Sequence, residues 1–219
     1  MKGIRQTGII GWVAMFILMA VLTSSAAKIN KIISAVQKKY RSLQTLKIEF
    51  RQISRFQLTK TESEIYGTLL LSGKDKFRLE TEDQVMVSNG KTFWRYNKLD
   101  QQVLIDYPKK EDQEVLFRDF LYDIKDKYFA ELVDEEKDGK KKIFVVKLIP
   151  KESDQSFFTS IKVWLEEESW KVRRVVYRDY NENETEFQIE HMELNPQYSP
   201  ATFEFAPPEG VEVVDLRFE

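Results

Sequence analysis

The stretch Val85–Asn97, VMVSNGKTFWRYN, decides the fold. Asn89-Gly90 lies between two runs in which apolar residues alternate with polar ones. This pattern predicts a β-hairpin, because a tight two-residue turn needs positive φ at both central positions. Successive side chains of a strand point to opposite faces, so Trp94 and Tyr96 share one face of the outgoing strand. The residues alone favour an ordinary core hairpin.

The first 27 residues have the pattern of an export signal. A short basic stretch, Met1–Arg5, precedes an apolar run over Gly8–Leu22 and then small residues that end at Ala26 and Ala27. A membrane span needs roughly 20 apolar residues, and this run is shorter. We therefore expect a signal peptide over residues 1–27, cleaved after Ala26 or Ala27, a periplasmic location, and one domain over residues 28–219.

Composition argues against several classes of protein. The chain has no cysteine, so it has neither a disulfide nor the acylated cysteine of a lipoprotein. The formal net charge is −2, and no basic stripe favours nucleic acid. His191 is the single histidine, the acidic residues come in runs typical of solvated turns, and no glycine-rich phosphate loop is present. We expect no catalytic centre, no metal site and no cofactor.

Most of the chain has the alternation of β-strands. Apolar residues recur at helical spacing over Ala27–Leu43, which predicts an amphipathic N-terminal helix. Turn residues separate the later segments, and no βαβ rhythm appears, which predicts an antiparallel sheet curled into a barrel or sandwich. Besides the two arms of the hairpin, the expected strands are Leu46–Phe50, Ile65–Leu71, Lys76–Glu82, Gln102–Tyr107, Lys142–Ile149, Ser160–Glu166, Trp170–Tyr180, Glu184–Leu194 and Thr202–Phe205.

The segment Asp112–Ile124, DQEVLFRDFLYDI, interrupts the strand pattern. Its apolar residues, Leu116 and Phe120 among them, suit a short helix that is apolar over more than half of its circumference. Such a helix can plug the core, or it can form a lid over an apolar cavity. The sequence does not separate these two interpretations.

Motifs along the chain resemble the LolA-like periplasmic lipoprotein carriers in the same order. The opening hairpin is similar to the family pattern V-S-(D/N)-G-K-T-x-W-x-Y-N, and the end of the chain resembles F-x-F-x-P-P-x-G-V. The matching segments besides the hairpin are Tyr40–Gln52, Gly67–Leu71, Lys76–Glu80, Leu148–Lys151, Arg178–Thr185 and Phe203–Val211. Together they span nearly all of the chain that follows the leader.

The resemblance implies a mainly β fold with helices (α+β). It implies an incomplete, strongly curved antiparallel β-barrel, with an N-terminal helix and short lid helices over an apolar cavity. It further implies a monomeric carrier that takes acylated lipoproteins from an inner-membrane ABC-type release complex to a LolB-like outer-membrane receptor, without enzymatic activity. The lipid-binding residues that it implies are Phe77, Leu79, Trp94, Tyr96, Leu116 and Phe120.

One position departs from the family pattern. The family often has Arg-Pro at the end of its G-x-L-x-L strand, an arginine linked to a closed lid, where this chain has Gly73-Lys74. The clamp is therefore absent, replaced by Lys74 or Arg78, or unnecessary. Three other functions stay open: a carrier of other lipids, a hydrolase that uses paired carboxylates, and an RseB-like periplasmic sensor, which shares the barrel and usually carries a second domain.

Overall fold

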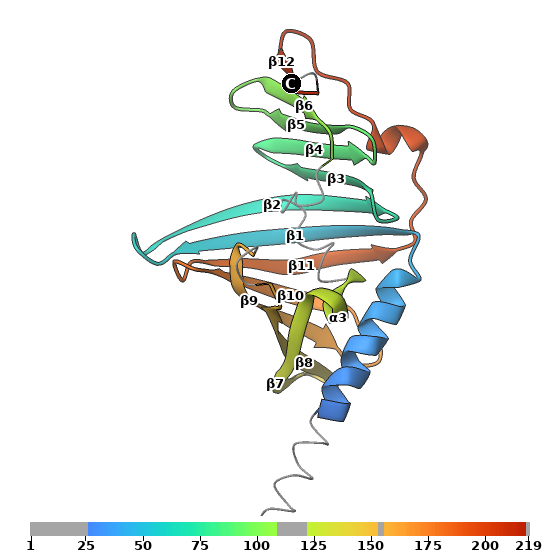
Figure 1. Cartoon of the computed structure of the whole chain (residues 1–219), viewed down its shortest axis with the longest axis vertical. Coiled ribbons are helices and arrows are strands. Elements are labelled where there is room, and N and C mark those ends of the chain that lie inside the picture. Colours follow the sequence, from blue (N-terminus) through green and yellow to red (C-terminus); the bar gives the residue numbers. More distant parts are fainter. Residues whose placement is uncertain (1–25, 109–121, 153–155, 218–219) are drawn as a thin grey trace, which may run out of the picture.

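The computed structural model describes residues 26–108, 122–152 and 156–217, and its centre is a 12-stranded sheet (Figure 1). The strands are β1 (Thr45–Phe56), β2 (Thr61–Ser72), β3 (Lys76–Thr81), β4 (Gln84–Asn89), β5 (Phe93–Asn97), β6 (Gln102–Asp106), β7 (Tyr128–Asp138), β8 (Lys141–Pro150), β9 (Phe158–Glu166), β10 (Val172–Asp179), β11 (Glu184–Leu194) and β12 (Glu212–Asp215).

The sheet is curled but not closed. Its strand order is β12-β6-β5-β4-β3-β2-β1-β11-β10-β9-β8-β7, so β12 and β7 are its edges. Neighbouring strands are antiparallel, except that β12 runs parallel to β6. The predicted mainly β fold with a strongly curved, incomplete barrel is confirmed.

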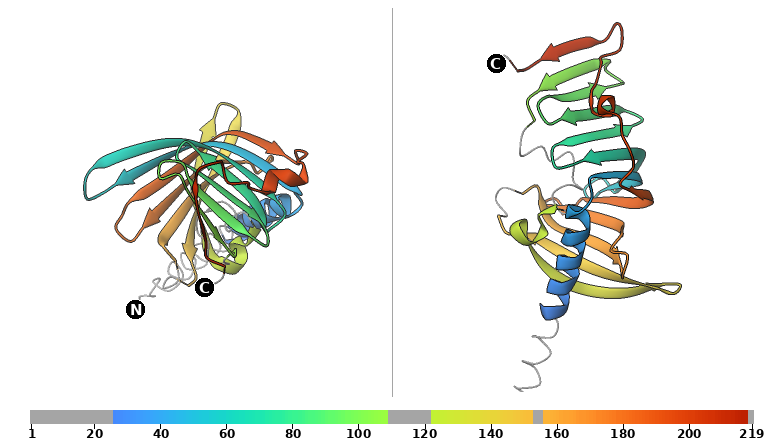
Figure 2. Two further views of the ribbon diagram at one scale, coloured as in Figure 1. Left: turned by 90° about the horizontal axis from the view of Figure 1, so that it is seen from above. Right: turned by 90° about the vertical axis from the view of Figure 1, so that its right-hand side faces the viewer.

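The N-terminal helix, residues 26–41, covers the half of the sheet that contains β8–β11 (Figures 1 and 2). Its apolar face belongs to the same buried cluster as the inward side chains of those strands. Tyr40, at 0% exposure, accepts a hydrogen bond through its hydroxyl from the Val172 backbone N–H at 3.1 Å. Lys39 donates to the Ser169 carbonyl in the β9–β10 turn, so both this turn and the start of β10 contact the helix.

The chain after β11 covers a different part of the sheet. Residues 195–211 pass along β3 and β4 through the 3-10 helix η2 (Pro200–Phe203) before β12 begins. Phe203 is 4% exposed and meets Tyr198 edge-on at 5.6 Å. The Asn89 side-chain amide donates to the Glu204 carboxylate at 3.1 Å. We call residues 195–211 the C-terminal cover.

The structure differs from the predicted elements at three places. The expected strand Thr202–Phe205 is wrong, because Pro200 begins the 3-10 turn at this point. Two strands were not predicted, β7 and β12, and both are edge strands; β7 alternates between half-buried and exposed side chains only over its first six residues. The predicted helix over Asp112–Ile124 lies outside the described residues up to position 121, after which a short helix, α3 (Ile124–Lys127), follows.

The hairpin between β4 and β5 is present, but its turn is displaced by one residue. Gly90 has φ +88°, whereas Asn89 is not among the residues with positive φ. The Asn89 N–H donates to the Thr92 carbonyl at 3.2 Å, which makes Gly90-Lys91 the two central residues. The Asn89 carboxamide oxygen accepts from the N–H groups of Lys91 and Thr92, each at 2.9 Å. Asn89 therefore stabilises the turn through its side chain, as Asx turns do.

Candidate functional site

One face of strands β2–β5 is lined with large apolar side chains. Residues directly opposite each other in antiparallel strands share a face. Leu79 pairs with Leu69 and Met86, and Ser88 pairs with Phe77 and Phe93. We call this surface the inner apolar face and define it by residues of the main buried cluster and one neighbour packed on it: Leu69, Leu71, Phe77, Leu79, Met86 and Phe93.

No described α-helix lies across the inner apolar face. The N-terminal helix and α3 lie over the other half of the sheet (Figures 1 and 2). The N-terminal helix also contacts the α3 segment, since Arg41 donates to the Tyr122 carbonyl at 2.8 Å and Lys125 donates to the Ser34 hydroxyl at 2.8 Å. The inner apolar face is continuous with the core, and its side chains are buried except for the half-buried Leu79, although no described α-helix crosses it.

The opposite face of the same strands is also apolar, and here the C-terminal cover packs on it. Val87 pairs with Trp94, and Val85 pairs with Tyr96, which places these four side chains together. Val85 and Val87 are 4% and 0% exposed but do not belong to the main buried cluster. The Tyr96 ring lies 5.8 Å from that of Phe205. This outer apolar face is therefore a second, separate layer of packing.

The structure separates the residues that were expected to form one lipid-binding site. Phe77, 4% exposed, and the half-buried Leu79 lie together on the inner apolar face. Trp94 and Tyr96 lie on the outer apolar face, so the four side chains do not line one cavity. Leu116 and Phe120 lie outside the described residues.

Phe93 occupies the inner position that Trp94 was expected to fill, and the sequence contains a signal that identifies it. Glu82-Asp83 is a two-residue turn, since Gln84 begins β4 directly after this pair and Thr81 ends β3 directly before it. A turn of two residues places Leu79 opposite Met86 and puts Trp94 on the other face. Recognising that turn length would have selected Phe93.

The arginine that the family resemblance offered as an alternative clamp does not reach the inner apolar face. Arg78 lies on the outer side of β3, opposite Val87, and its guanidinium donates to Glu80 at 3.2 Å. Lys74 is exposed in the β2–β3 turn beside Gly73, which has φ +60°. On the inner side, the Arg95 guanidinium lies 5.6 Å from the Phe93 ring and gives that end of the face a positive charge.

The outer side of the half of the sheet that contains β8–β11 is polar and carries ion pairs. Glu186, with a side chain 3% exposed, lies 2.7 Å from both Arg55 and Arg174. Burial opposes ionisation of Glu186, but hydrogen bonds from Gln188 and Arg55 and the charge of Arg174 outweigh it and hold the pKa of this carboxyl below its ordinary value. The two sides of this half therefore differ sharply in polarity.

The described residues contain no recognisable reaction centre. His191 is exposed on β11, and within residues 26–108, 122–152 and 156–217 no three His, Asp or Glu side chains gather as metal ligands would. The same part of the chain contains no helix that is both long and apolar enough to span a membrane. The most distinctive chemical feature is the inner apolar face, which suits an apolar ligand.

Comparison with known proteins agrees with this interpretation of the fold. A family model described as "Outer membrane lipoprotein carrier protein LolA" matches residues 41–206. A protein called "Outer-membrane lipoprotein carrier protein", from Legionella pneumophila (strain Corby), is 25% identical over 214 residues, which cover 91% of this chain and 98% of that protein.

Two further similarities extend beyond that species. "Uncharacterized protein MJ0687" from Methanocaldococcus jannaschii is 22% identical over 192 residues, covering 84% of this chain; the chain spans about half (53%) of that relative's length. The crystal structure of an uncharacterized conserved protein from Thermus thermophilus superposes with a TM-score of 0.57 at 12% identity, covering 85% of this chain and 98% of that one. The latter likeness shows a shared fold.

Proposed function

The chain belongs to the LolA outer-membrane lipoprotein carrier family, and we propose that it binds the acyl chains of lipoproteins on its inner apolar face and carries them through the periplasm. The single observation that supports this proposal is the inner apolar face itself. It is continuous with the core, and no described α-helix crosses it.

The energetics explain why such a surface suits this cargo. Each CH₂ group transferred from water to an apolar surface contributes about 0.8 kcal/mol, so exposing several acyl chains to water costs on the order of tens of kcal/mol. A lipoprotein therefore needs a covered path through an aqueous compartment. The large side chains of the inner apolar face can supply that cover by contact alone, without chemical reaction.

We propose Phe77, Leu79, Met86 and Phe93 as acyl-chain contacts. The unbranched Met86 side chain adapts its shape readily, which suits a flexible ligand. Leu116 and Phe120 are proposed as further contacts from the sequence pattern of Asp112–Ile124 only. Trp94 and Tyr96 instead lie on the outer apolar face, where Tyr96 packs against Phe205 of the C-terminal cover, and their proposed role is to support the sheet from that side.

Family membership supports the proposed partners. We propose that an inner-membrane ABC-type release complex supplies the lipoprotein, that a LolB-like outer-membrane receptor accepts it, and that the protein acts as an exported monomer. Binding must be moderate in strength for the second step, because a ligand held too tightly is not released to the receptor.

Native mass spectrometry of the protein purified from its own periplasm tests the proposal. A bound triacylated lipoprotein is the expected result. A bound lipid without peptide would favour a carrier of other lipids. A complex with a membrane-anchored regulatory protein and no lipid would favour an RseB-like sensor. Either of the latter results contradicts lipoprotein transport.

A matched pair of substitutions localises the ligand. Leu79→Ser removes an apolar side chain from the inner apolar face, whereas Leu70→Ser removes the same side chain from the outer side of the neighbouring strand, where Leu70 pairs with Arg78. We expect the first variant to lose about tenfold in lipoprotein affinity and the second to keep it. Equal losses would contradict the assignment to the inner apolar face.

A further inference from the structure

Three neighbouring hairpin ends carry large apolar side chains that point into solvent. Leu58 is 94% exposed in the β1–β2 turn, and Phe56, at the end of β1, is 45% exposed. Tyr180, in the β10–β11 turn, is 58% exposed, and Phe157, just before β9, is 65% exposed. We call Phe56, Leu58, Phe157 and Tyr180 the hairpin rim.

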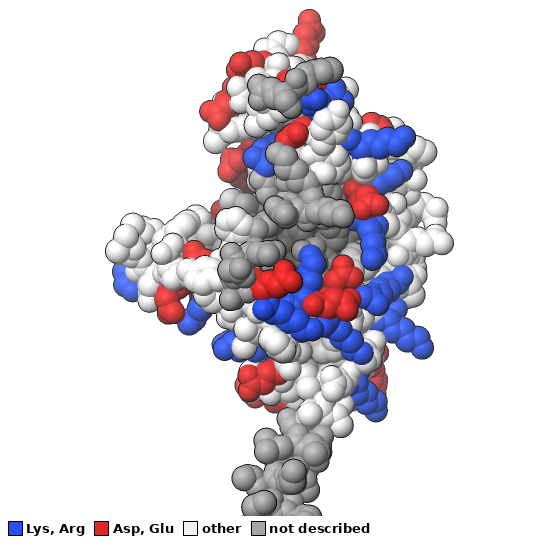
Figure 3. Space-filling view, viewed as in Figure 1, with Lys and Arg blue, Asp and Glu red and all other residues white. Residues whose placement is uncertain are grey.

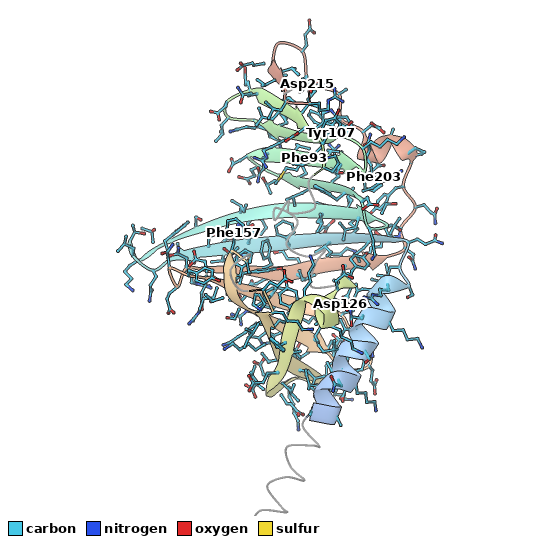
Figure 4. All side chains as sticks on the ribbon, viewed as in Figure 1. Phe93, Tyr107, Asp126, Phe157, Phe203 and Asp215 are labelled. Carbon is cyan, nitrogen blue, oxygen red and sulfur yellow. The ribbon has the colours of Figure 1, made fainter. Side chains whose placement is uncertain are left out.

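The members of the hairpin rim lie on connected turns. The Gln57 N–H donates to the Asn183 side-chain oxygen at 2.8 Å, which joins the β1–β2 and β10–β11 turns. Phe158 pairs with Asp179, so the two residues next to this pair, Phe157 and Tyr180, are neighbours across β9 and β10. The β1–β2 hairpin extends beyond the rest of the sheet, and Phe157 lies near the same end (Figures 1 and 4).

The opposite ends of these and the adjoining strands have a different composition. The connections there are the β2–β3 turn (Gly73–Asp75), the β4–β5 turn (Gly90–Thr92) and the β9–β10 turn (Glu167–Lys171). Among the described residues, no exposed large apolar side chain occurs in these three turns. Polar residues and glycine are the usual choice in turns, so leucine and aromatic residues at the rim need a separate explanation.

We propose that the hairpin rim inserts into the surface of a lipid bilayer. Its apolar side chains stand on separate, protruding turns rather than in a groove or on a flat patch, so each can enter between lipid headgroups on its own. Leucine, phenylalanine and tyrosine are suited to the boundary between water and acyl chains. In Figure 3 the tip and upper side of the left-hand protrusion are mainly white, and Lys, Arg, Asp and Glu side chains lie along its lower edge.

The charges near the hairpin rim determine what kind of membrane contact follows. Arg178 is ion-paired with Glu182 at 3.5 Å and with Glu184 at 2.7 Å. The Lys60 ammonium donates to the Gln57 side chain at 2.9 Å. Because positive and negative groups balance, insertion depends on apolar contact and only weakly on anionic lipid. This contact is shallow and reversible, as a protein that must leave the membrane requires.

The inference goes beyond carriage of an acyl chain, since the hairpin rim and the inner apolar face share no residue. It assigns the protein a membrane-facing end, at which the protein rests while cargo enters or leaves. It can be tested without any lipoprotein, so its failure would leave the proposed carrier function untouched.

The absence of cysteine makes a site-specific test possible. Thr59→Cys, next to Leu58, and Lys74→Cys, in the polar β2–β3 turn, are each labelled with the environment-sensitive fluorophore NBD. The labelled, processed chain is mixed with vesicles of phosphatidylcholine, with and without phosphatidylglycerol. We expect a blue shift and increased intensity at position 59 with both vesicles, and no change at position 74. The further changes Leu58→Ser and Phe157→Ser, added to Thr59→Cys, should weaken vesicle binding at least about tenfold.

The same measurements identify the outcomes that overturn the proposal. No response at position 59, or equal responses at positions 59 and 74, would contradict insertion of the hairpin rim. A response that rises with protein concentration in the absence of vesicles would instead assign the rim to contact between copies of the chain. Circular dichroism of the Leu58→Ser and Phe157→Ser variant checks that the fold is kept, as expected for exposed positions.

Discussion

The two halves of the sheet are covered on opposite sides. Over β8–β11 the N-terminal helix packs on the inner side, and the outer side carries ion pairs such as that of Glu186 with Arg174. Over β3–β6 the C-terminal cover packs on the outer side, where Tyr96 meets Phe205. The inner side of this second half is apolar, and no described α-helix crosses it.

This difference explains how one continuous sheet can hold a stable core and a binding surface. A sheet face that is apolar needs a cover, which is either part of the chain or a ligand. The half under the N-terminal helix has its cover built in. In the other half, the C-terminal cover packs on the outer side, and the buried inner apolar face has no described α-helix across it, so we propose that an acyl chain can take the place of a built-in cover there.

The largest expected effect comes from the helix-covered half. Tyr40→Ala removes a completely buried ring and leaves the Val172 N–H without its partner, so we expect the free energy of unfolding to fall by about 4 kcal/mol. Urea denaturation followed by circular dichroism measures the change. Tyr40→Phe, which keeps the ring, should cost only about 1 kcal/mol. A similar loss of unfolding free energy in both variants would show that the Tyr40 hydroxyl, and not packing of the helix, contributes most of the stability in this half.

A smaller and more local effect is expected from the C-terminal cover. Phe203→Ala removes a buried ring from the outer side, so we expect a loss of about 3 kcal/mol in the free energy of unfolding. Hydrogen exchange should speed up in β4 and β5, where Val87 and Trp94 lie, and change little in β8 and β9. Equal acceleration of hydrogen exchange in all strands would contradict the view that the N-terminal helix and the C-terminal cover stabilise the two halves independently.

The smallest effect concerns the ion pairs of the outer side. Glu186→Gln leaves Arg174 without its carboxylate, and we expect a loss of about 2 kcal/mol near neutral pH. The pKa of Glu186 is lowered in the folded state, so its contribution is present above the ordinary pKa of a glutamate and is lost as the pH falls through the folded pKa. The difference between variant and parent should therefore shrink in acid.

Urea denaturation of the Glu186→Gln variant and its parent at several pH values checks this expectation. Ser63→Ala serves as a control, because Ser63 does not titrate and lies exposed on the nearby strand β2. A difference between Glu186→Gln and its parent that stays constant from neutral pH to strongly acidic pH would contradict a stabilising ionised Glu186.

Strong alternation made some elements predictable, and its absence hid others. The segment Glu184–Leu194 was predicted with the bounds that β11 has, because its two faces differ in polarity. β7 was missed because its first half is mainly apolar on both faces and its second half is charged on both faces, so its sequence has no such contrast. Thr202–Phe205 alternates but begins within a 3-10 turn, because Pro200 sets the backbone before it.

Which residues form the candidate site depends on the face of the sheet to which each side chain points. The lengths of the turns between the strands decide this. Phe77 and Leu79 were predicted on a common face, and they share one. The assignment of Trp94 to the same face failed because the pairing across the Glu82-Asp83 turn was not taken into account. Shifting the pairing by one residue reverses every side chain of a strand. Sequence patterns within single strands therefore cannot assign the inner face without the turns between them.

One measurement tests most directly whether acyl chains occupy the inner apolar face. A photo-crosslinking amino acid is placed at Leu79, on the inner side of β3, and in a second variant at Arg78, its neighbour on the outer side. Irradiation of cells that are exporting lipoproteins should give a lipoprotein adduct from position 79 and none from position 78. Adducts from both positions at equal yield, or from position 78 alone, would contradict the account.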